Sequence, residues 1–394
     1  MIGDRVAQAE PVARPAVRRL TLADFRCYRT LRLETDSRPV VLTGANGAGK
    51  TNILEALSFL VPGRGLRRAG AADITRHGLA AGSPWAVAAT LDGPAGRVEI
   101  GTGREAGHER RSVRIDGKPA KPGDLAGLVS ALWLTPAMDR LFIEGASGRR
   151  RFLDRLVFGL VPGHGAEAGA YEHAMRERTR LLRAARDGGP RVDPAWMAAL
   201  EEGMARHGTR VALARVESIR RLDEACRAGL GPFPAAGLAV EGEIEGWLAG
   251  GLSPDEAEER FRGALRVARA RDEAAGAATM GPHRSDLMVR HVPKDLPAGQ
   301  CSTGEQKAVL VSIVLAQGRV QDQSGGRAPL LLLDEVAAHL DEVRRAALFD
   351  ELCALKAQSW MTGTDAMLFA GFGERAQFFR VTDATVAPEE VMTL

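Results

Sequence analysis

The sequence has no long hydrophobic run, and it contains few cysteines. None of its 394 residues falls in a stretch near the roughly 18 apolar residues that a membrane-spanning helix needs. Its four cysteines form no CxxC pair, which argues against a zinc site or a disulfide framework. The N-terminus also lacks the apolar segment of a signal peptide. We therefore expect a cytoplasmic protein with reduced thiols and no membrane association.

The composition is that of a globular chain, with 45% hydrophobic and 26% charged residues, which argues against disorder of the whole chain. The net charge is only +3, so it permits DNA binding without arguing for it. Arginine carries most of the positive charge, which makes each lysine more interesting as a candidate for a specific role. The lysines are Lys50, Lys118, Lys121, Lys294, Lys307 and Lys356.

Short strands are predicted in the first third of the chain. Leu20, Leu22, Leu31 and Leu33 alternate with polar residues as in half-buried strands, and residues 40–43 read as a buried strand. Further short strands are predicted after these, and turn signals separate them, which suggests an antiparallel meander. These further candidate strands are residues 86–91, 97–100, 112–115 and 132–135.

The middle of the chain, from about residue 147 to 276, has apolar residues at helical spacing and predicts a packed helical bundle. Strand-like sequence returns at 330–333 and 359–362. This order predicts an α/β fold whose core is split around a helical insertion. The expected parts are a flexible tail (1–16), the first half of the core (17–145), a helical lobe (146–278) and the second half of the core (279–394).

A phosphate-loop motif, G-x-x-x-x-G-K-[ST], follows the strand at 40–43. Its glycines let backbone N–H groups face phosphates without Cβ interference. Lys50 would neutralise the β- and γ-phosphates of ATP, and the Thr51 hydroxyl would ligate Mg²⁺. The helix predicted over 51–60 adds its positive dipole end. A Gly-rich turn without a ligand is the alternative. The expected nucleotide-binding residues here are Gly44, Ala45, Asn46, Gly47, Ala48, Gly49, Lys50, Thr51 and Asn52.

Four leucines followed by Asp334 and Glu335 predict a central parallel strand with carboxylates at its carboxyl end, where α/β sites lie. Asp334 would hold Mg²⁺, directly or through water. Glu335 would orient or deprotonate the attacking water. An aspartate that caps a helix after a core strand is the alternative interpretation. Together with the phosphate loop, this segment predicts an ATPase.

The segment 301–307 (C-S-T-G-E-Q-K) resembles the signature of ABC ATPases. By that resemblance, Ser302 and Gly304 contact the γ-phosphate held by the opposite subunit. Leu340-Asp341 resembles the D-loop at the same interface, so the resemblance implies a homodimer closed around ATP. Without it, S-T-G-E would be only a capping box at a helix start.

Five further segments resemble the RecF family, and they span nearly the whole chain. They are residues 24–28 (D-F-R-C-Y), 44–56, 149–154 (R-R-R-F-L-D), 279–286 (T-M-G-P-H-R-S-D) and 362–365 (T-G-T-D). The sequence departs from the family at Ala137, where glutamate is usual and where coupling between ATP and the helical lobe is expected. Residues 176–179 follow a family R-N motif only loosely. T-G-T-D stands where many ABC ATPases carry a switch histidine.

The resemblance implies an ABC-type ATPase head with an inserted helical lobe, without the long coiled coil of SMC proteins. The implied role is in recombinational repair and replication, in the nucleoid of a bacterial cytoplasm. The protein would bind gapped or single-strand/double-strand junction DNA, and would help RecR, with RecO, to load the RecA recombinase. ATP would join two heads, and a weak, DNA-stimulated hydrolysis would release them.

Contacts with the DNA backbone need clustered arginine or lysine. For each cluster the alternative is a solvated face or a structural ion pair. No base-reading motif is present, so recognition of DNA shape is predicted. His283 and Arg284 also attract attention, although a satisfied structural histidine is at least as expected as a catalytic one. The DNA-contact candidates are Arg64, Arg67, Arg68, Arg110, Arg111, Arg149, Arg150 and Arg151.

Two other classes share the nucleotide motifs. The ATPase subunit of a membrane transporter has the same phosphate loop, signature and Asp-Glu strand, but the Q-loop glutamine and switch histidine are absent here. An architectural SMC-like clamp component would need a longer helical arm than the insertion can form. Stimulation of the ATPase by DNA, or co-fractionation with membrane, would separate these alternatives.

Overall fold

The computed structural model describes residues 15–80, 82–93, 96–188, 193–323, 328–355 and 357–390. Residues 1–14 of the expected tail, and Lys356, lie outside the described residues. The chain divides into two compact units. The first unit comprises residues 1–131, 321–333 and 349–394, and the second comprises residues 132–320 and 334–348. The four-part division predicted from the sequence stays a prediction.

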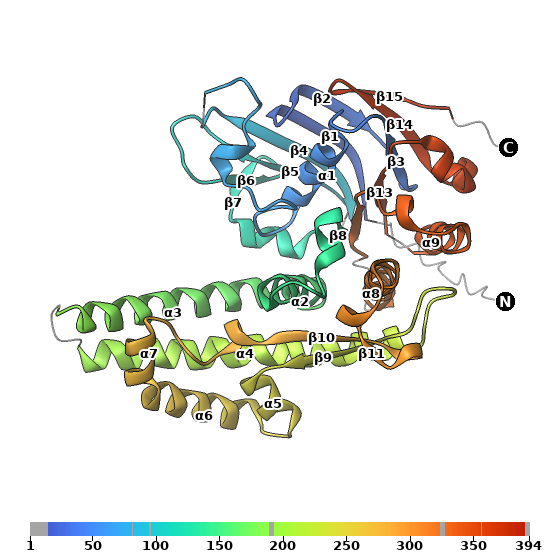
Figure 1. The fold of residues 1–394 in the computed structure, drawn as a ribbon. Coiled ribbons are helices and arrows are strands. Elements are labelled where there is room, and N and C mark those ends of the chain that lie inside the picture. The colour runs from blue at the N-terminus through green and yellow to red at the C-terminus, as the bar shows by residue number, and fades with distance from the viewer. Residues whose placement is uncertain are drawn as a thin grey trace, which may run out of the picture. The chain divides into compact units, whose positions relative to one another are not determined.

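An antiparallel sheet in the first unit confirms the predicted meander, in the order β2-β1-β4-β5-β6-β7 (Figure 1). Leu20 and Leu22 are buried while Thr21 and Ala23 are exposed, as the alternating pattern requires. β1 starts at Ala16, the last residue of the segment expected as a tail. The strands are β1 (Ala16–Phe25), β2 (Tyr28–Glu34), β4 (Trp85–Gly93), β5 (Gly96–Arg104), β6 (Ser112–Ile115) and β7 (Lys118–Ala120).

A second sheet runs β15-β14-β3-β13-β12-β8, so that β12 lies between β13 and β8 (Ala131–Leu134). The strands β14, β3, β13 and β12 are parallel, and β15 pairs with β14 in the antiparallel sense. All four leucines of β12 are buried, because a central parallel strand has both faces covered. The carboxyl ends of β3, β13 and β12 therefore meet at one edge. The strands are β3 (Val40–Thr43), β12 (Leu330–Leu333), β13 (Ser359–Thr362), β14 (Gln377–Thr382) and β15 (Thr385–Pro388).

The helix predicted over 51–60 is confirmed as α1 (Lys50–Leu57), followed by a 3-10 turn (Ser58–Leu60). Its Ile53, Leu54 and Leu57 are fully buried. Helices α8 (Thr303–Gln323) and α9 (Glu342–Ala354) each have residues in both units. The strand predicted at 132–135 is β8 (Ala131–Leu134).

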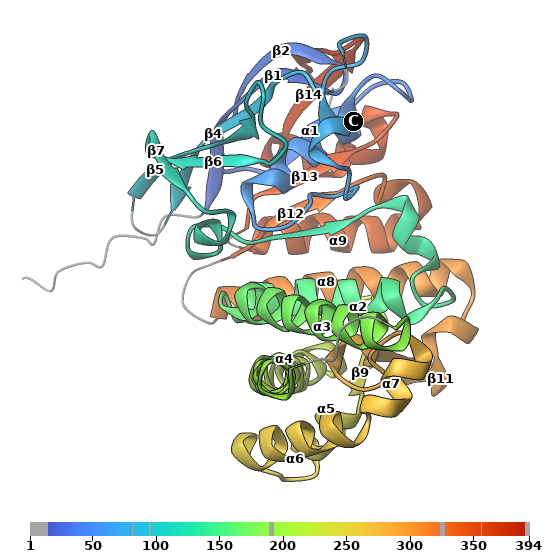
Figure 2. The ribbon, with the colours of Figure 1, turned by 90° about the vertical axis from the view of Figure 1, so that its left-hand side faces the viewer.

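The second unit is mainly helical, and α4 lies between α3 and α6 (Figure 2). Its buried core includes Tyr171, Met204, Phe261 and Leu265. The 34 residues of α4 span about 50 Å, which fits the predicted short arm. The helices are α2 (Ala146–Leu160), α3 (His164–Arg186), α4 (Pro194–Arg227), α5 (Glu243–Ala249), α6 (Pro254–Val267) and α7 (Arg269–Ala275).

The purely helical prediction for 147–276 is wrong at one place. β9 (Ala236–Glu241) lies inside that segment and pairs with β10 (Asp286–His291), which also pairs with β11 (Leu296–Pro297). The partner of β9 stands about 50 residues further along the chain, so local spacing could not reveal the pairing. In the described part of the chain, no helix is long and apolar enough to cross a membrane.

Candidate nucleotide-binding site

The phosphate loop leaves β3 through three glycines in the left-handed region. The backbone φ angles of Gly44, Gly47 and Gly49 are 137°, 83° and 117°, values that residues other than glycine rarely adopt. A Cβ at Gly44 would overlap the carbonyl oxygen of Val381, and one at Gly49 would lie 2.7 Å from the Tyr28 hydroxyl. The loop is thus held closely at both ends. At Gly47, in its middle, a Cβ would have no neighbour within 4 Å.

Lys50 curls back over this loop. Its side chain is 5% exposed, and Nζ donates hydrogen bonds to the carbonyl oxygens of Gly44 (2.6 Å) and Ala45 (2.9 Å). Lys50 is also the first residue of α1, so the cation lies beside the positive end of the helix dipole. A buried cation, an open loop and a helix N-terminus together suit a phosphate group. The residues present therefore fit a nucleotide.

The segment 24–28 packs against the phosphate loop and the start of α1, a role that the sequence did not reveal. The Tyr28 hydroxyl donates to the carbonyl of Gly49 (3.1 Å), and burial raises the pKa of Tyr28. Arg26 forms a two-pronged ion pair with the buried Glu55 of α1 (2.6 and 2.9 Å). The Asn52 side chain, expected at the nucleotide, donates to the Cys27 sulfur (3.1 Å). This segment therefore fixes both the loop and α1.

Asp334 and Glu335 follow β12 directly. Asp334 is 6% exposed, and its backbone N–H donates to the carbonyl of Leu134 (2.8 Å). Glu335 has a φ of 53°, an unfavourable conformation for this residue type that costs of order 1–2 kcal/mol. Such strain persists only where the surroundings hold it, and it is frequent at functional sites. The predicted position of both carboxylates at a strand end is confirmed, while their roles stay predictions.

The signature segment starts α8 through a capping box. Ser302 donates to the Glu305 carboxylate from its N–H (3.0 Å) and its hydroxyl (2.9 Å), and Glu305 N–H donates back to the hydroxyl (3.4 Å). The ion pair with Lys294 and these bonds hold the pKa of Glu305 at about 2. Ser302 and Gly304 are exposed. The turn is therefore held by its own hydrogen bonds and presents its signature residues to solvent.

Asp341, predicted as a D-loop residue, is exposed and accepts from the backbone N–H of Arg344 (2.8 Å) at the start of α9. Both ring nitrogens of His283 have hydrogen-bond partners. Nδ1 shares a hydrogen bond with the Tyr171 hydroxyl (2.7 Å), and Nε2 bonds to the carbonyl of Ala278 (3.0 Å). Burial is the main cause that lowers the pKa of His283. These contacts favour the structural interpretation of His283.

Some of the predicted arginines have a described partner and several are exposed, and Arg67 is both. Arg149 forms a two-pronged ion pair with Asp286 (2.6 and 2.8 Å). Arg67 pairs with Glu55 (3.0 Å), and burial against Phe59 lowers the pKa of Arg111 to about 10. Arg150 donates to the carbonyl of Ser285 (3.0 Å). Four of the candidates are exposed in addition to Arg67: Arg64, Arg68, Arg110 and Arg151.

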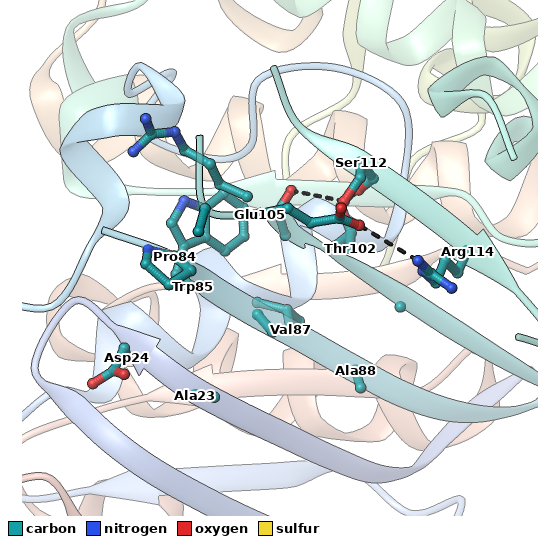
Figure 3. Close-up of a pocket in the computed structure, with 15 residues that line it drawn as sticks. Ala23, Asp24, Pro84, Trp85, Val87, Ala88, Thr102, Glu105, Ser112 and Arg114 are labelled. Carbon is teal, nitrogen blue, oxygen red and sulfur yellow. Dashed lines mark hydrogen bonds and ion pairs between the residues drawn. The ribbon is translucent and has the colours of Figure 1, made fainter. Parts of the chain in front are cut away.

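A cavity of about 470 Å³ lies on the sheet of the first unit, between β1, β4 and β5 (Figure 3). Small side chains such as Ala23 and Ala88 form its floor, and the ion pair between Glu105 and Arg114 (3.5 Å) lies at its edge. None of its lining residues belongs to the phosphate loop. Its size alone therefore does not make it the nucleotide site.

Among the described residues, no group of three or more His, Cys, Asp or Glu side chains could hold a metal ion. Magnesium sites at nucleotides typically use one or two protein oxygens together with phosphate oxygens and water. Thr51 and Asp334 are the right kinds of ligand for such a shared site.

Residues 16–385 match the family model of the RecF/RecN/SMC N-terminal domain. The chain is 51% identical over 375 residues to the DNA replication and repair protein RecF of Rhizobium etli (strain CIAT 652), covering 93% of this chain and 97% of that one. It is 52% identical over 379 residues to the protein of the same name from Caulobacter vibrioides, covering 95% and 98%.

Solved structures agree on the fold. The structure of the recombination mediator protein RecF-ATPrS in the RecFOR pathway superposes with a TM-score of 0.81 at 19% identity, covering 96% of this chain and 99% of that chain. An Smc head domain from Pyrococcus furiosus superposes with a TM-score of 0.53 at 16% identity, covering 96% of both chains. The predicted ABC-type head with a helical insertion is thereby confirmed, and neither the transporter nor the clamp alternative is favoured. The chain belongs to the RecF family of DNA replication and repair proteins, within the wider group of RecF, RecN and SMC ATPases.

Proposed function

We propose that this chain is an ATP-dependent DNA-binding protein that binds gapped or junction DNA and, with RecR and RecO, assists loading of the RecA recombinase. The observation that carries the proposal is the phosphate loop. Three of its glycines have positive φ angles, and the buried Lys50 that follows them donates a hydrogen bond back to the loop. Relatives named RecF cover nearly the whole chain, and a solved structure of that name contains ATP. The protein would act as a weak, DNA-stimulated ATPase.

In this proposal, ATP binds at residues 44–52 and Mg²⁺ would neutralise charge on its phosphates. Lys50 would exchange its two carbonyl partners for phosphate oxygens, which are stronger acceptors because they are charged. Thr51 and Asp334 would ligate the metal. Glu335 would orient the attacking water and accept its proton.

ATP would join two copies of the chain. Ser302 and Gly304 are exposed at the start of α8, and a Cβ at Gly304 would have no neighbour within 4 Å. This open turn is suited to meet the γ-phosphate held by a second subunit, with Asp341 at the same interface. A contact with the γ-phosphate would favour the dimer with ATP over the dimer with ADP.

For DNA, we propose the exposed arginines as backbone contacts and set Arg149 aside, because it is committed to Asp286. Arg151 and Arg284 are exposed; the charge of Arg151 acts on Arg150, and the charges of Arg284 and Arg150 both act on His283. A plot of log affinity against log salt concentration has a negative slope, and each phosphate contact that is removed should make that slope less steep by about 1. Arg151→Ala should show that loss with the fold intact, whereas Arg149→Ala should lower the melting temperature.

Light scattering with ATP or ADP, with and without gapped duplex DNA, tests the proposal as a whole. We expect ATP alone to produce a dimer and gapped DNA to strengthen it. Lys50→Ala is the control that should bind no nucleotide and stay monomeric. A wild-type mass that stays monomeric, and does not respond to DNA, would contradict the dimer and the DNA role together.

A further inference from the structure

Lys307 is a buried lysine that none of the roles above uses. It lies on α8, and its side chain is only 8% exposed. Nζ forms an ion pair with Asp139 Oδ2 (3.6 Å), which lies on the 3-10 turn Pro136–Arg140. Burying a cation is costly unless it is paired, so this position calls for a charged partner. The turn that holds Asp139 also contains Ala137, the departure from the family pattern.

The surroundings of Lys307 include the Asp334–Glu335 pair. A cavity of about 10 Å³, close to the size needed for one water molecule, is lined by Thr135, Asp139, Lys307 and Asp334. The negative charge of Glu335 also acts on Lys307. Burial lowers the pKa of Lys307, while Asp139 and Glu335 oppose that change. Lys307 therefore pairs with Asp139, lines a small cavity together with Asp334, and lies in the electrostatic field of Glu335.

The same helix carries the signature turn. Ser302 caps α8, Gly304 lies in its first turn, and the Gln306 side chain donates to the carbonyl of Cys301 (2.8 Å). Residues 308–316 are buried, so the helix is firmly packed behind this turn. A displacement of the signature turn would consequently move Lys307 with it.

We propose that Lys307 is a positioning residue that couples the signature turn of this chain to its own Asp334–Glu335 pair. The inference rests on the proposed dimer, in which the signature turn completes the site of the other subunit. Lys307 then connects the two sites, because it belongs to the helix that contacts one nucleotide and faces the carboxylates that act on the other. ATP at one site thereby sets the position of the hydrolytic carboxylates at the second site.

The experiment compares the ATPase of the wild type with Lys307→Gln and Lys307→Arg. Lys118→Gln, on the exposed strand β7, is the control for loss of a lysine charge. We expect a wild-type Hill coefficient between 1 and 2, since two sites are coupled. Lys307→Gln should lower kcat on the order of tenfold and bring the Hill coefficient to about 1. Its ATP-dependent dimer and nucleotide affinity should persist, and Lys307→Arg should restore cooperativity.

Two results would overturn the inference. The first is a Lys307→Gln variant that keeps the kcat and Hill coefficient of the wild type. The second is a loss of nucleotide binding and dimerisation in both Lys307 variants, which would show a structural role only. A wild type that neither dimerises nor hydrolyses ATP would instead remove the proposed function on which the inference rests, so the two failures are distinguishable.

Discussion

The hydroxyl of Tyr28 donates a hydrogen bond to the carbonyl of Gly49, 3.1 Å away, and thereby joins the start of β2 to the last glycine of the phosphate loop. The ring fills the space that a side chain at position 49 would need. The left-handed conformation of Gly49 and the position of Tyr28 thus depend on each other. This contact links Tyr28, 21 positions before Gly49, to the predicted nucleotide site.

Tyr28→Phe should weaken ATP binding and leave the fold intact. The variant loses one neutral hydrogen bond, worth about 0.5–1.5 kcal/mol, which corresponds to roughly a two- to tenfold increase in Kd. Titration calorimetry with ATP would measure it. Tyr171→Phe is the matched control, because Tyr171 is the other tyrosine of the chain and bonds to His283 in the second unit. Its melting temperature should fall while its ATP affinity stays unchanged, and equal effects of both variants on affinity would refute the role of Tyr28.

Arg178→Met should destabilise the protein strongly. The guanidinium is fully buried and pairs with Glu201 (3.1 Å) and Asp272 (2.6 Å), so its removal takes away the cation paired with Asp272 and one of the two cations paired with Glu201. Losing one partner of a buried ion pair costs about 3–5 kcal/mol. Because Arg269 still pairs with Glu201, we expect a loss near the lower end. Urea unfolding would measure it, against Arg220→Ala, an exposed i,i+4 pair worth less than about 1 kcal/mol. Similar losses in both variants would contradict this account.

Much of the fold follows from local patterns in the sequence. The alternation around Leu20 and Leu31 predicted β1 and β2, and continuous apolar runs predicted β3 and β12. In each of these strands, the order of apolar and polar residues is enough to predict which side chains are buried. β9 was missed because its six residues have no pattern that stands apart from the surrounding helices, and its pairing with β10 is a long-range contact. Local spacing carries no information on such pairings.

The candidate site shows the same limit. The phosphate loop and the Asp-Glu strand end were predictable because each motif is contiguous. The supports of the site were not, since Tyr28 reaches Gly49 and Lys307 reaches Asp139 only in the folded chain. The arginines illustrate a further point, because Arg149 and Arg151 are equivalent in sequence. Only the structure shows that the first pairs with Asp286 while the second is exposed.

Stability should fall as the pH drops below the ordinary pKa of histidine, and His283 should account for part of that fall. Burial lowers the pKa of His283, so below about pH 6.5 the unfolded chain takes up a proton that the folded protein resists. The loss begins near pH 6.5 and is complete once the pH passes below the folded pKa. Urea midpoints at pH 8 and pH 5.5 would measure it. His283→Gln can still bond to Ala278 and Tyr171 but cannot titrate, so its midpoint should change less than that of the wild type. An equal change in both proteins would contradict the assignment.

Glu335→Gln should trap a dimer that holds ATP. The amide has nearly the size and shape of the carboxylate, so the strained backbone at position 335 should be retained, but an amide cannot accept the proton of the attacking water. Loss of a general base typically costs 10²- to 10⁴-fold, and hydrolysis should fall by about that factor. Light scattering should then show a dimer that persists with ATP, whereas the wild type returns to monomer as ATP is consumed. Glu342→Gln, at the exposed start of α9, should behave as the wild type. A Glu335→Gln protein that binds ATP yet stays monomeric at saturation would separate nucleotide binding from dimerisation, and the signature turn could then no longer be assigned to the site of a second subunit.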